Sequence, residues 1–215
     1  MSATLPANAT PPKRARGRPR KTLDERDEGN RRRQLMKAAA KLFRRKGFDA
    51  TSTRDIASAV GMHAGSPFYH FKSKGDLLYA LMEEGMQTAL DRQARVLVPD
   101  DAPAAQLKRL IRSHFDTLHG PGRDFIPVML YESRSLTPRQ RAGIAKLQRD
   151  YEAAWMPSLS ALHAGGQLRA DAHLARLMIF GALNWSVQWF DARKQASLDE
   201  ITDAAMALFI REEHP

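Results

Sequence analysis

The chain has 215 residues, of which 43% are hydrophobic and 27% are charged, a balance that excludes a collagen-like or wholly disordered protein. It contains no cysteine, which excludes disulfides, thiol nucleophiles and cysteine zinc sites. No apolar run reaches the roughly 20 residues of a membrane span, and the N-terminus lacks the apolar segment of a signal peptide. We therefore expect a cytoplasmic protein with no membrane partner.

Positive charge is concentrated in the first third of the chain. Residues 1–74 hold 18 Lys and Arg against 6 Asp and Glu, whereas residues 75–215 hold 16 against 18. Clustered cations gain from counterion release on a phosphate backbone, whereas a generally basic protein would spread its charge evenly. The distribution predicts that the first third binds nucleic acid.

Residues 1–30 are rich in Pro, Ala, Thr and charge, with Leu23 as the single large apolar residue after the start. Such a segment cannot bury enough surface to offset its ordering entropy, so we predict a disordered basic tail. One stretch of it, with arginines around a Gly-Pro sequence, resembles an AT-hook, whose arginines enter narrow A·T-rich minor grooves. Nonspecific attraction to phosphates is the alternative for so short a match. The arginines are Arg16, Arg18 and Arg20.

From Arg31 the apolar residues recur at helical spacing as far as Gly47, which is a good C-terminal stop. A capping-box pattern at residues 52–55 opens a short helix that ends at Gly61. A second short helix must fit before residues 73–76, where another such pattern opens a long helix. Two short helices around a glycine turn are typical of a helix-turn-helix, whose second helix enters a major groove about 12 Å wide.

The same segment resembles the DNA-binding domain of the TetR family of one-component bacterial repressors. One departure is Pro67, where the family more often has a flexible or aliphatic residue, and it bears on how bases are read. The resemblance implies a DNA-binding domain at residues 31–76, an effector-binding and dimerisation domain at residues 77–215, and a homodimer on palindromic operator DNA. It is carried by Phe43, Gly47 and residues 51–57, 60–62, 65–66 and 68–78.

The resemblance also implies roles for single residues. The expected phosphate contacts are Thr53, Tyr69, His70 and Lys74, all donors suited to that task. The expected base-facing residues are His63, Ala64, Gly65, Ser66 and Phe68. Tyr69 as a half-buried brace and His70 as a packing histidine are the alternatives. Phe43 and Phe71 are expected in the core.

Downstream, every segment reads as helix, so we predict an all-α protein of about nine helices without strands. Thr137 and Pro138 begin a helix that we expect to continue to about Leu162 with a kink at Pro157. The final helix opens with a capping box at Ser197, and its expected buried residues are Ile201, Ala205 and Leu208.

The stretch from Leu174 to Trp189 is apolar around nearly its whole circumference. A helix of this kind is buried on both sides, which suggests a partner subunit on one side and the domain interior on the other. The last helix carries small residues that permit close approach to a second copy, giving a four-helix interface. Plain core burial is the alternative. The small residues are Ala204, Ala205 and Ala207.

Residues 149–166, 181–185 and 189–190 are similar to the C-terminal domain of TetR-family regulators of fatty-acid and steroid breakdown, whose effectors are acyl-CoA thioesters. We therefore expect a small-molecule effector of this class, with CoA phosphates met by arginines that could also be ordinary surface charges. Those are Arg109, Arg112, Arg134 and Arg149. The expected pocket residues are His114, Phe115, Met129, Arg134, Tyr151, Asn184, Trp185 and Trp189, although both tryptophans suit a core as well.

An enzyme is not expected. The seven histidines show no metal-ligand spacing, and neither a nucleophile elbow nor a phosphate-binding glycine loop is present, so no metal or cofactor is predicted. A ligand-independent architectural DNA-binding protein is the better alternative, because of the basic tail. Such a protein would not need a near-neutral helical domain of this size. Activation remains open beside repression.

Overall fold

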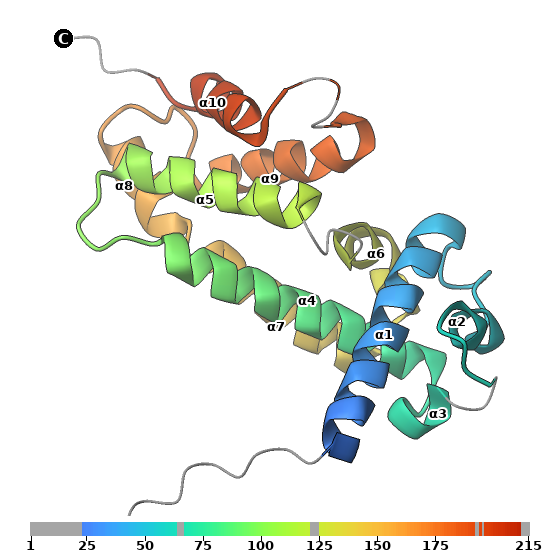
Figure 1. Ribbon diagram of the computed structural model, residues 1–215. Helices are drawn as coiled ribbons and strands as arrows, with labels where there is room; N and C mark the ends of the chain where they lie inside the picture. The colour runs from blue at the N-terminus through green and yellow to red at the C-terminus, as the bar shows by residue number, and fades with distance from the viewer. Residues whose placement is uncertain (1–22, 64–66, 121–124, 192–193, 195, 212–215) are drawn as a thin grey trace, which may run out of the picture.

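The computed structural model describes residues 23–63, 67–120, 125–191, 194 and 196–211, and only the backbone at residues 23–28, 67 and 68. All regular structure in these ranges is helical, which confirms the predicted all-α class (Figure 1). A 3-10 turn, Ser133–Ser135, joins α6 to α7. The helices are α1 (Leu23–Lys46), α2 (Thr53–Ala59), α3 (Pro67–His70), α4 (Lys74–Val96), α5 (Pro103–His119), α6 (Phe125–Glu132), α7 (Pro138–Ala153), α8 (Met156–Ala164), α9 (Ala172–Trp189) and α10 (Leu198–Phe209).

Helix α1 begins at Leu23, eight residues before the predicted start at Arg31. The tail prediction considered only the lack of apolar residues, and for residues 23–30 it was wrong. The sequence there is acidic, and negative charge near a helix N-terminus stabilises the helix through its macrodipole. The rest of the predicted tail, with Arg16, Arg18 and Arg20, lies outside the described residues.

Local capping explains most helix boundaries. Ser52 accepts a hydrogen bond from the Asp55 backbone N–H at 3.1 Å, and reciprocal capping boxes also open α7 at Thr137 and α10 at Ser197. An N-cap of this kind contributes about 1 kcal/mol. Gly61 ends the turn after α2 with a φ of 68°, a left-handed conformation that glycine adopts without a Cβ penalty.

The predicted single helix from residue 138 to about 162 is two helices in the structure, α7 and α8, with Ala154 and Trp155 between them. Pro157 occupies the first turn of α8, where its missing N–H costs nothing, whereas inside a continuous helix it would remove a hydrogen bond and clash with the preceding turn. The break explains why there are more helices than predicted.

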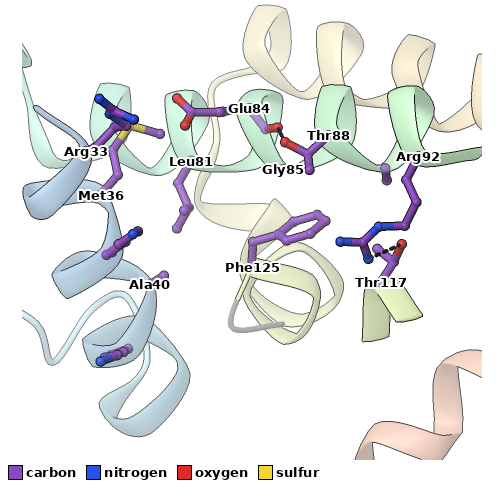
Figure 2. A pocket seen from close by; sticks show the side chains of 13 residues that line it. Arg33, Met36, Ala40, Leu81, Glu84, Gly85, Thr88, Arg92, Thr117 and Phe125 are labelled. Atoms are coloured by element: carbon purple, nitrogen blue, oxygen red, sulfur yellow. Dashed lines mark hydrogen bonds between the residues drawn. The ribbon is translucent and has the colours of Figure 1, made fainter. Parts of the chain in front are cut away.

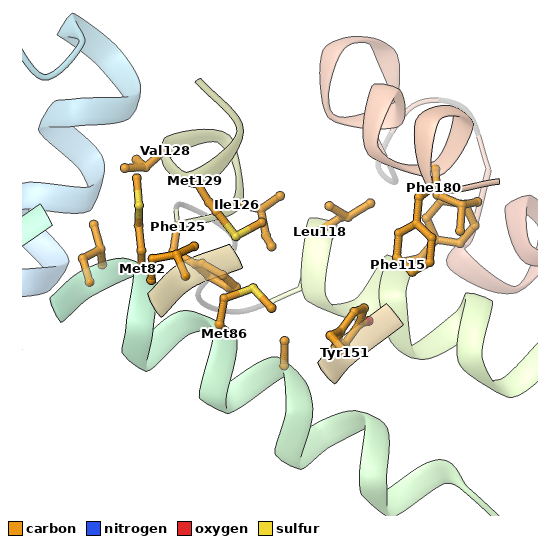
Figure 3. Packing of buried hydrophobic residues seen from close by; sticks show 14 of the residues in the cluster. Met82, Met86, Phe115, Leu118, Phe125, Ile126, Val128, Met129, Tyr151 and Phe180 are labelled. Carbon is orange, nitrogen blue, oxygen red and sulfur yellow. The ribbon is translucent and has the colours of Figure 1, made fainter. Parts of the chain in front are cut away.

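One continuous hydrophobic core joins the N-terminal helices to the rest of the chain. Helix α1 packs on α4 and α6, and α4 continues across α5 and α7 (Figure 1). Phe43 and Phe71 are buried as predicted. Further along, the same core contains methionines of α4 and α6 and aromatic residues of α5, α7 and α9 (Figure 3). Helix α1, which packs against α2, is therefore packed directly on α4 and α6 of the rest of the chain.

Helix α9 is buried on one side only. Ile179, Phe180 and Leu183 face the core, whereas Leu174, Leu177, Met178 and Trp185 are more than half exposed. Leu208 of α10 was predicted to be buried, but it is 81% exposed. The helical period of α10 alone places Leu208 near Ile201 and Ala205, but α10 packs on α5 through a narrower stripe.

Candidate DNA-binding and effector sites

The helix-turn-helix is built from α2, the Gly61 turn and α3. Ile56 and Ala57 of α2 are buried against α1, and the Met62 backbone N–H closes the turn on the Ala57 carbonyl at 2.9 Å. Helix α3 follows as residues Pro67–His70. The N-terminal part of the predicted recognition helix, with Ala64, Gly65 and Ser66, lies outside the described residues, and of Phe68 only the backbone is described.

The described side chains of this motif are accessible. Tyr69 is 91% exposed, so it does not brace the domain from a half-buried position. His63 is exposed, and Thr53 at the start of α2 and His70 at the end of α3 are partly exposed. These four residues are therefore free to meet a polyanion.

Lys74 was expected to contact phosphate, but in the structure its ammonium group binds inside the protein. Its ammonium donates to the Phe48 carbonyl at 2.7 Å and to the Thr51 carbonyl at 2.9 Å, and it lies 4.1 Å from the centroid of the Phe48 ring. Two of its three N–H donors are thus used inside the protein. Lys74 joins the first turn of α4 to the segment between α1 and α2, and so holds the helix-turn-helix in place.

Three of the expected effector residues meet in the core between α5, α7 and α9. His114 Nδ1 lies 3.0 Å from the Tyr151 hydroxyl, and His114 Nε2 lies 3.2 Å from Asn184 Oδ1. Because Oδ1 can only accept, Nε2 carries the proton and Nδ1 accepts from Tyr151. The cluster lines a cavity of about 50 Å³, to which Met129 of α6 also contributes.

Burial sets the protonation of this cluster. It lowers the pKa of His114 to about 4, although the hydrogen bond to Asn184 acts in the opposite direction and the nearby His119 lowers the pKa further. Burial also raises the pKa of the Tyr151 phenol above its ordinary value. At neutral pH both side chains are therefore uncharged, and the cluster suits a neutral polar group such as a carbonyl.

The remaining expected pocket residues are not at this cavity. Phe115 is a core residue, and Arg134 is exposed in the turn after α6. Trp185 is 63% exposed. Because adjacent residues of a helix point about 100° apart, Trp185 points away from the cavity that its neighbour Asn184 faces. Trp189 is also half exposed and packs edge-on against Phe190.

The four arginines considered for CoA phosphates are spread over the surface. Arg109 pairs with Asp101, and Arg112 joins Asp116 and Asp199, which connects α5 to α10. Arg134 and Arg149 are exposed on other helices. The structure does not gather these arginines around the cavity.

Sequence reasoning missed Gln93, which extends the polar cluster. Its side-chain amide donates to the Tyr151 carbonyl at 3.0 Å and accepts from the Trp155 indole at 2.8 Å. The sequence does contain a sign of its position: Gln93 follows Met82, Met86 and Ala89 at helical spacing, so it lies on the same buried face of α4. Phe180, which stacks on Trp155 and lines the cavity, was also missed.

Comparison with known proteins places this architecture. Residues 35–81 match the family of bacterial regulatory proteins of the tetR type, and residues 100–212 match the tetracyclin repressor-like C-terminal domain. The chain belongs to the TetR family. The helix-turn-helix typical of TetR proteins therefore corresponds to α2 and α3. In the part of the chain that the structure describes, no helix is both long enough and apolar enough to cross a membrane.

Individual proteins resemble the chain at low to moderate sequence identity. The HTH-type transcriptional repressor KstR2 of Rhodococcus jostii (strain RHA1) is 22% identical over 190 residues, which cover 87% of this chain and 93% of KstR2. The structure of PfiT, described as a superantigen, is 35% identical with a TM-score of 0.70, covering 85% of this chain and 97% of PfiT. The structure of AibR in complex with isovaleryl coenzyme A and operator DNA is 24% identical in sequence, with a TM-score of 0.76. The match covers 83% of this chain and 97% of AibR.

Proposed function

We propose that this TetR-family protein is a repressor that binds a palindromic operator as a homodimer and releases it when an acyl-CoA thioester binds. The observation that carries the proposal is the uncharged His114–Tyr151–Asn184 cluster. It lies in the core beneath α4, the same helix whose first turn holds the helix-turn-helix through Lys74. A ligand at the cluster is thereby linked to the DNA-binding helices.

The DNA contacts are assigned to the accessible side of α2 and α3. In this proposal Thr53, Tyr69 and His70 donate to phosphates. The residues that meet base edges in the major groove are His63, Ala64, Gly65, Ser66 and Phe68. The exposure of Tyr69 supports this assignment, because its hydroxyl is accessible to a phosphate. Residues 31–76 then form the reading domain and residues 77–215 the effector and dimerisation domain.

The dimer interface is assigned to the exposed apolar side of α9 together with α10. Leu174, Leu177, Met178 and Trp185 follow one helical face, and Leu208 of α10 is exposed as well. Contiguous exposed apolar surface of this kind is typical of a protein interface. A two-fold dimer presents two recognition helices to two half-sites, as a palindrome requires.

The effector class follows from the chemistry of the cluster and from the fold shared with AibR. Asn184 uses its Oδ1 on His114, which leaves its Nδ2 group as a donor for a thioester carbonyl. Met86, Met129 and Phe180 supply apolar walls for an acyl chain. The charged residue that lines this cavity, Glu152, is itself a carboxylate and is paired with Arg176, so the site disfavours a free carboxylate, because burying an unpaired charge is costly.

The test is release of operator fragments by a panel of short and long acyl-CoAs, the matching free acids and CoA alone. We expect release by the thioesters only. Equal release by acids and thioesters would show that CoA is not recognised, and release by none would favour the ligand-independent architectural alternative. Asn184→Ala should abolish the response and leave operator affinity unchanged, with Ser160→Ala, an exposed position of α8 outside the cluster and the proposed interface, as the control.

A further inference from the structure

A groove opens on the surface between α1, α4 and α6, separate from the His114 cavity (Figure 2). Its volume is about 400 Å³, within the roughly 300–1,000 Å³ of typical small-molecule sites. Met36, Leu81 and Phe125 form an apolar floor, and all three are buried. The inner cavity of about 50 Å³ is far too small to hold a whole thioester, whereas the groove is large enough for its bulky part.

The rim of the groove is cationic. Arg33, Lys37 and Lys41 of α1 lie at intervals of four residues, and Arg92 of α4 stands opposite them. The one carboxylate of the lining, Glu84, is paired with Arg32 at 3.2 Å. Among the described residues no salt bridge engages Lys37 or Lys41. Because like charges four residues apart destabilise a helix, a bound anion would relieve the repulsion along α1.

The groove and the inner cavity share walls. Ala89 and Thr117 line both, and Arg92 donates to the Thr117 hydroxyl at 3.3 Å from the groove side. Phe125 lines the groove: its ring rests on Gly85, where a Cβ would overlap it, and the next residue, Ile126, lines the inner cavity. Figure 2 shows the Phe125 ring between Leu81 and Arg92.

We infer that this groove binds the phosphate-bearing end of the effector, while the acyl end passes Phe125 into the inner cavity. The inference rests on the proposed function and deepens it. Phosphates are held by Lys37, Lys41 and Arg92. A ligand seated there contacts α1 and α4 together, so it acts directly on how the DNA-binding helices are packed against the rest of the chain.

The test uses direct binding by calorimetry to the full chain without DNA, with CoA, an acyl-CoA and the matching free acid as probes. The variant Lys37→Gln with Lys41→Gln should bind both CoA compounds at least about tenfold more weakly, because two charge-assisted contacts to phosphate are lost. Arg95→Gln, an exposed cation of α4 outside the groove, is the matched control and should change nothing.

Four outcomes are decisive. In the first outcome the double variant binds acyl-CoA as the wild-type protein does, and the thioester still releases the wild-type protein from DNA. This result overturns the assignment of the groove and leaves the proposed function standing. If the ligand-free double variant instead loses operator affinity by the same factor, the lysines serve DNA and the groove is also overturned. Absence of any acyl-CoA binding to the wild-type protein removes the proposed function and the groove together. The expected selective loss supports both.

The passage beside Phe125 has a separate readout. Phe125→Leu removes the ring that the acyl chain passes in this proposal but keeps an apolar side chain, so acyl-CoA should associate several-fold faster with the variant in stopped-flow measurements. CoA alone, which has no acyl chain to pass, should associate at the wild-type rate. Equal acceleration for both probes would overturn the passage, and a melting curve of the variant confirms that it is folded.

Discussion

At the scale of single residues, His114 shows how burial controls chemistry in this core. The ring is held between a hydroxyl donor and an amide acceptor, so its two nitrogens have fixed and opposite roles. Protonation would place a second donor against Tyr151 in a buried site. The neutral ring is therefore part of the folded structure and not only of the ligand site.

We predict a pH-dependent stability from this histidine. Its pKa is about 4 in the folded chain and 6.5 in the unfolded chain, so only the unfolded chain takes up this proton between those values. The free energy of unfolding should fall as the pH drops from 6.5 towards 4, by up to about 3 kcal/mol. Urea denaturation across this range measures it. The variant His114→Gln should show a shallower dependence, and an unchanged slope would contradict the assignment.

Gly85 provides a second test at the residue scale. A methyl group there would overlap the Phe125 ring and force it from its buried position. We expect Gly85→Ala to lower the free energy of unfolding by about 1–3 kcal/mol, the usual cost of overpacking. Gly75→Ala, in the first turn of the same helix with only an ordinary contact to Ser73, should be neutral or slightly stabilising. Similar effects of both changes would argue against a tight contact.

At the scale of elements, the first turn of α4 stabilises the DNA-binding domain. The Ser73 hydroxyl accepts from the Asp76 backbone at 3.0 Å, and Lys74 reaches two carbonyls between α1 and α2. These contacts link the start of α4 to the segment before α2. A shift of α4 would therefore act through these hydrogen bonds on the segment between α1 and α2.

This arrangement changes what a Lys74 substitution should do. We expect Lys74→Met to lower the free energy of unfolding by about 1–3 kcal/mol, because two charge-assisted hydrogen bonds are lost. Operator affinity should fall without the decrease of about one unit in the salt slope that loss of a phosphate contact would give. Thermal unfolding and salt titrations measure the two effects, with the exposed neighbour Lys72→Met as the control for stability. A stable variant with a shallower salt slope would restore Lys74 as a phosphate contact.

At the scale of the whole molecule, the proposed dimer explains the unusual surface of α9. We expect Met178→Glu to produce monomers in sedimentation experiments and to weaken operator binding, since a charge on this face would be buried unpaired between two copies. Monomer folding should be unaffected because Met178 is 69% exposed. Val98→Glu, exposed after the end of α4, is the control. A Met178→Glu protein that stays dimeric would move the interface elsewhere.

The basic N-terminal segment allows a further test at this scale. Deleting residues 1–21 removes Arg16, Arg18 and Arg20, so binding should weaken more for operators flanked by A·T pairs than for those flanked by G·C pairs. Fluorescence anisotropy with paired operators measures the difference. Equal losses would support plain attraction to phosphates.

The sequence by itself determined the helical class, the helix caps and the helix-turn-helix, because these depend on contacts between residues a few positions apart. Ser52 with Asp55, Gly61 and the Ser197 box all act within one turn, and a pattern of that range is visible in the chain. The start of α1 lies in an acidic stretch without apolar periodicity, and the kink expected at Pro157 is a full break between two helices, because a proline inside a continuous helix clashes with the preceding turn.

Only the tertiary structure decided which residues meet across helices. It brought His114, Tyr151 and Asn184 together from three helices, added Gln93, and turned the neighbouring Trp185 out to the surface. It also engaged Lys74 internally and opened the groove between α1 and α4. Helical periodicity gives the face on which a residue lies but not the rotation of that face against its neighbours, which is set by the packing of side chains from the whole core.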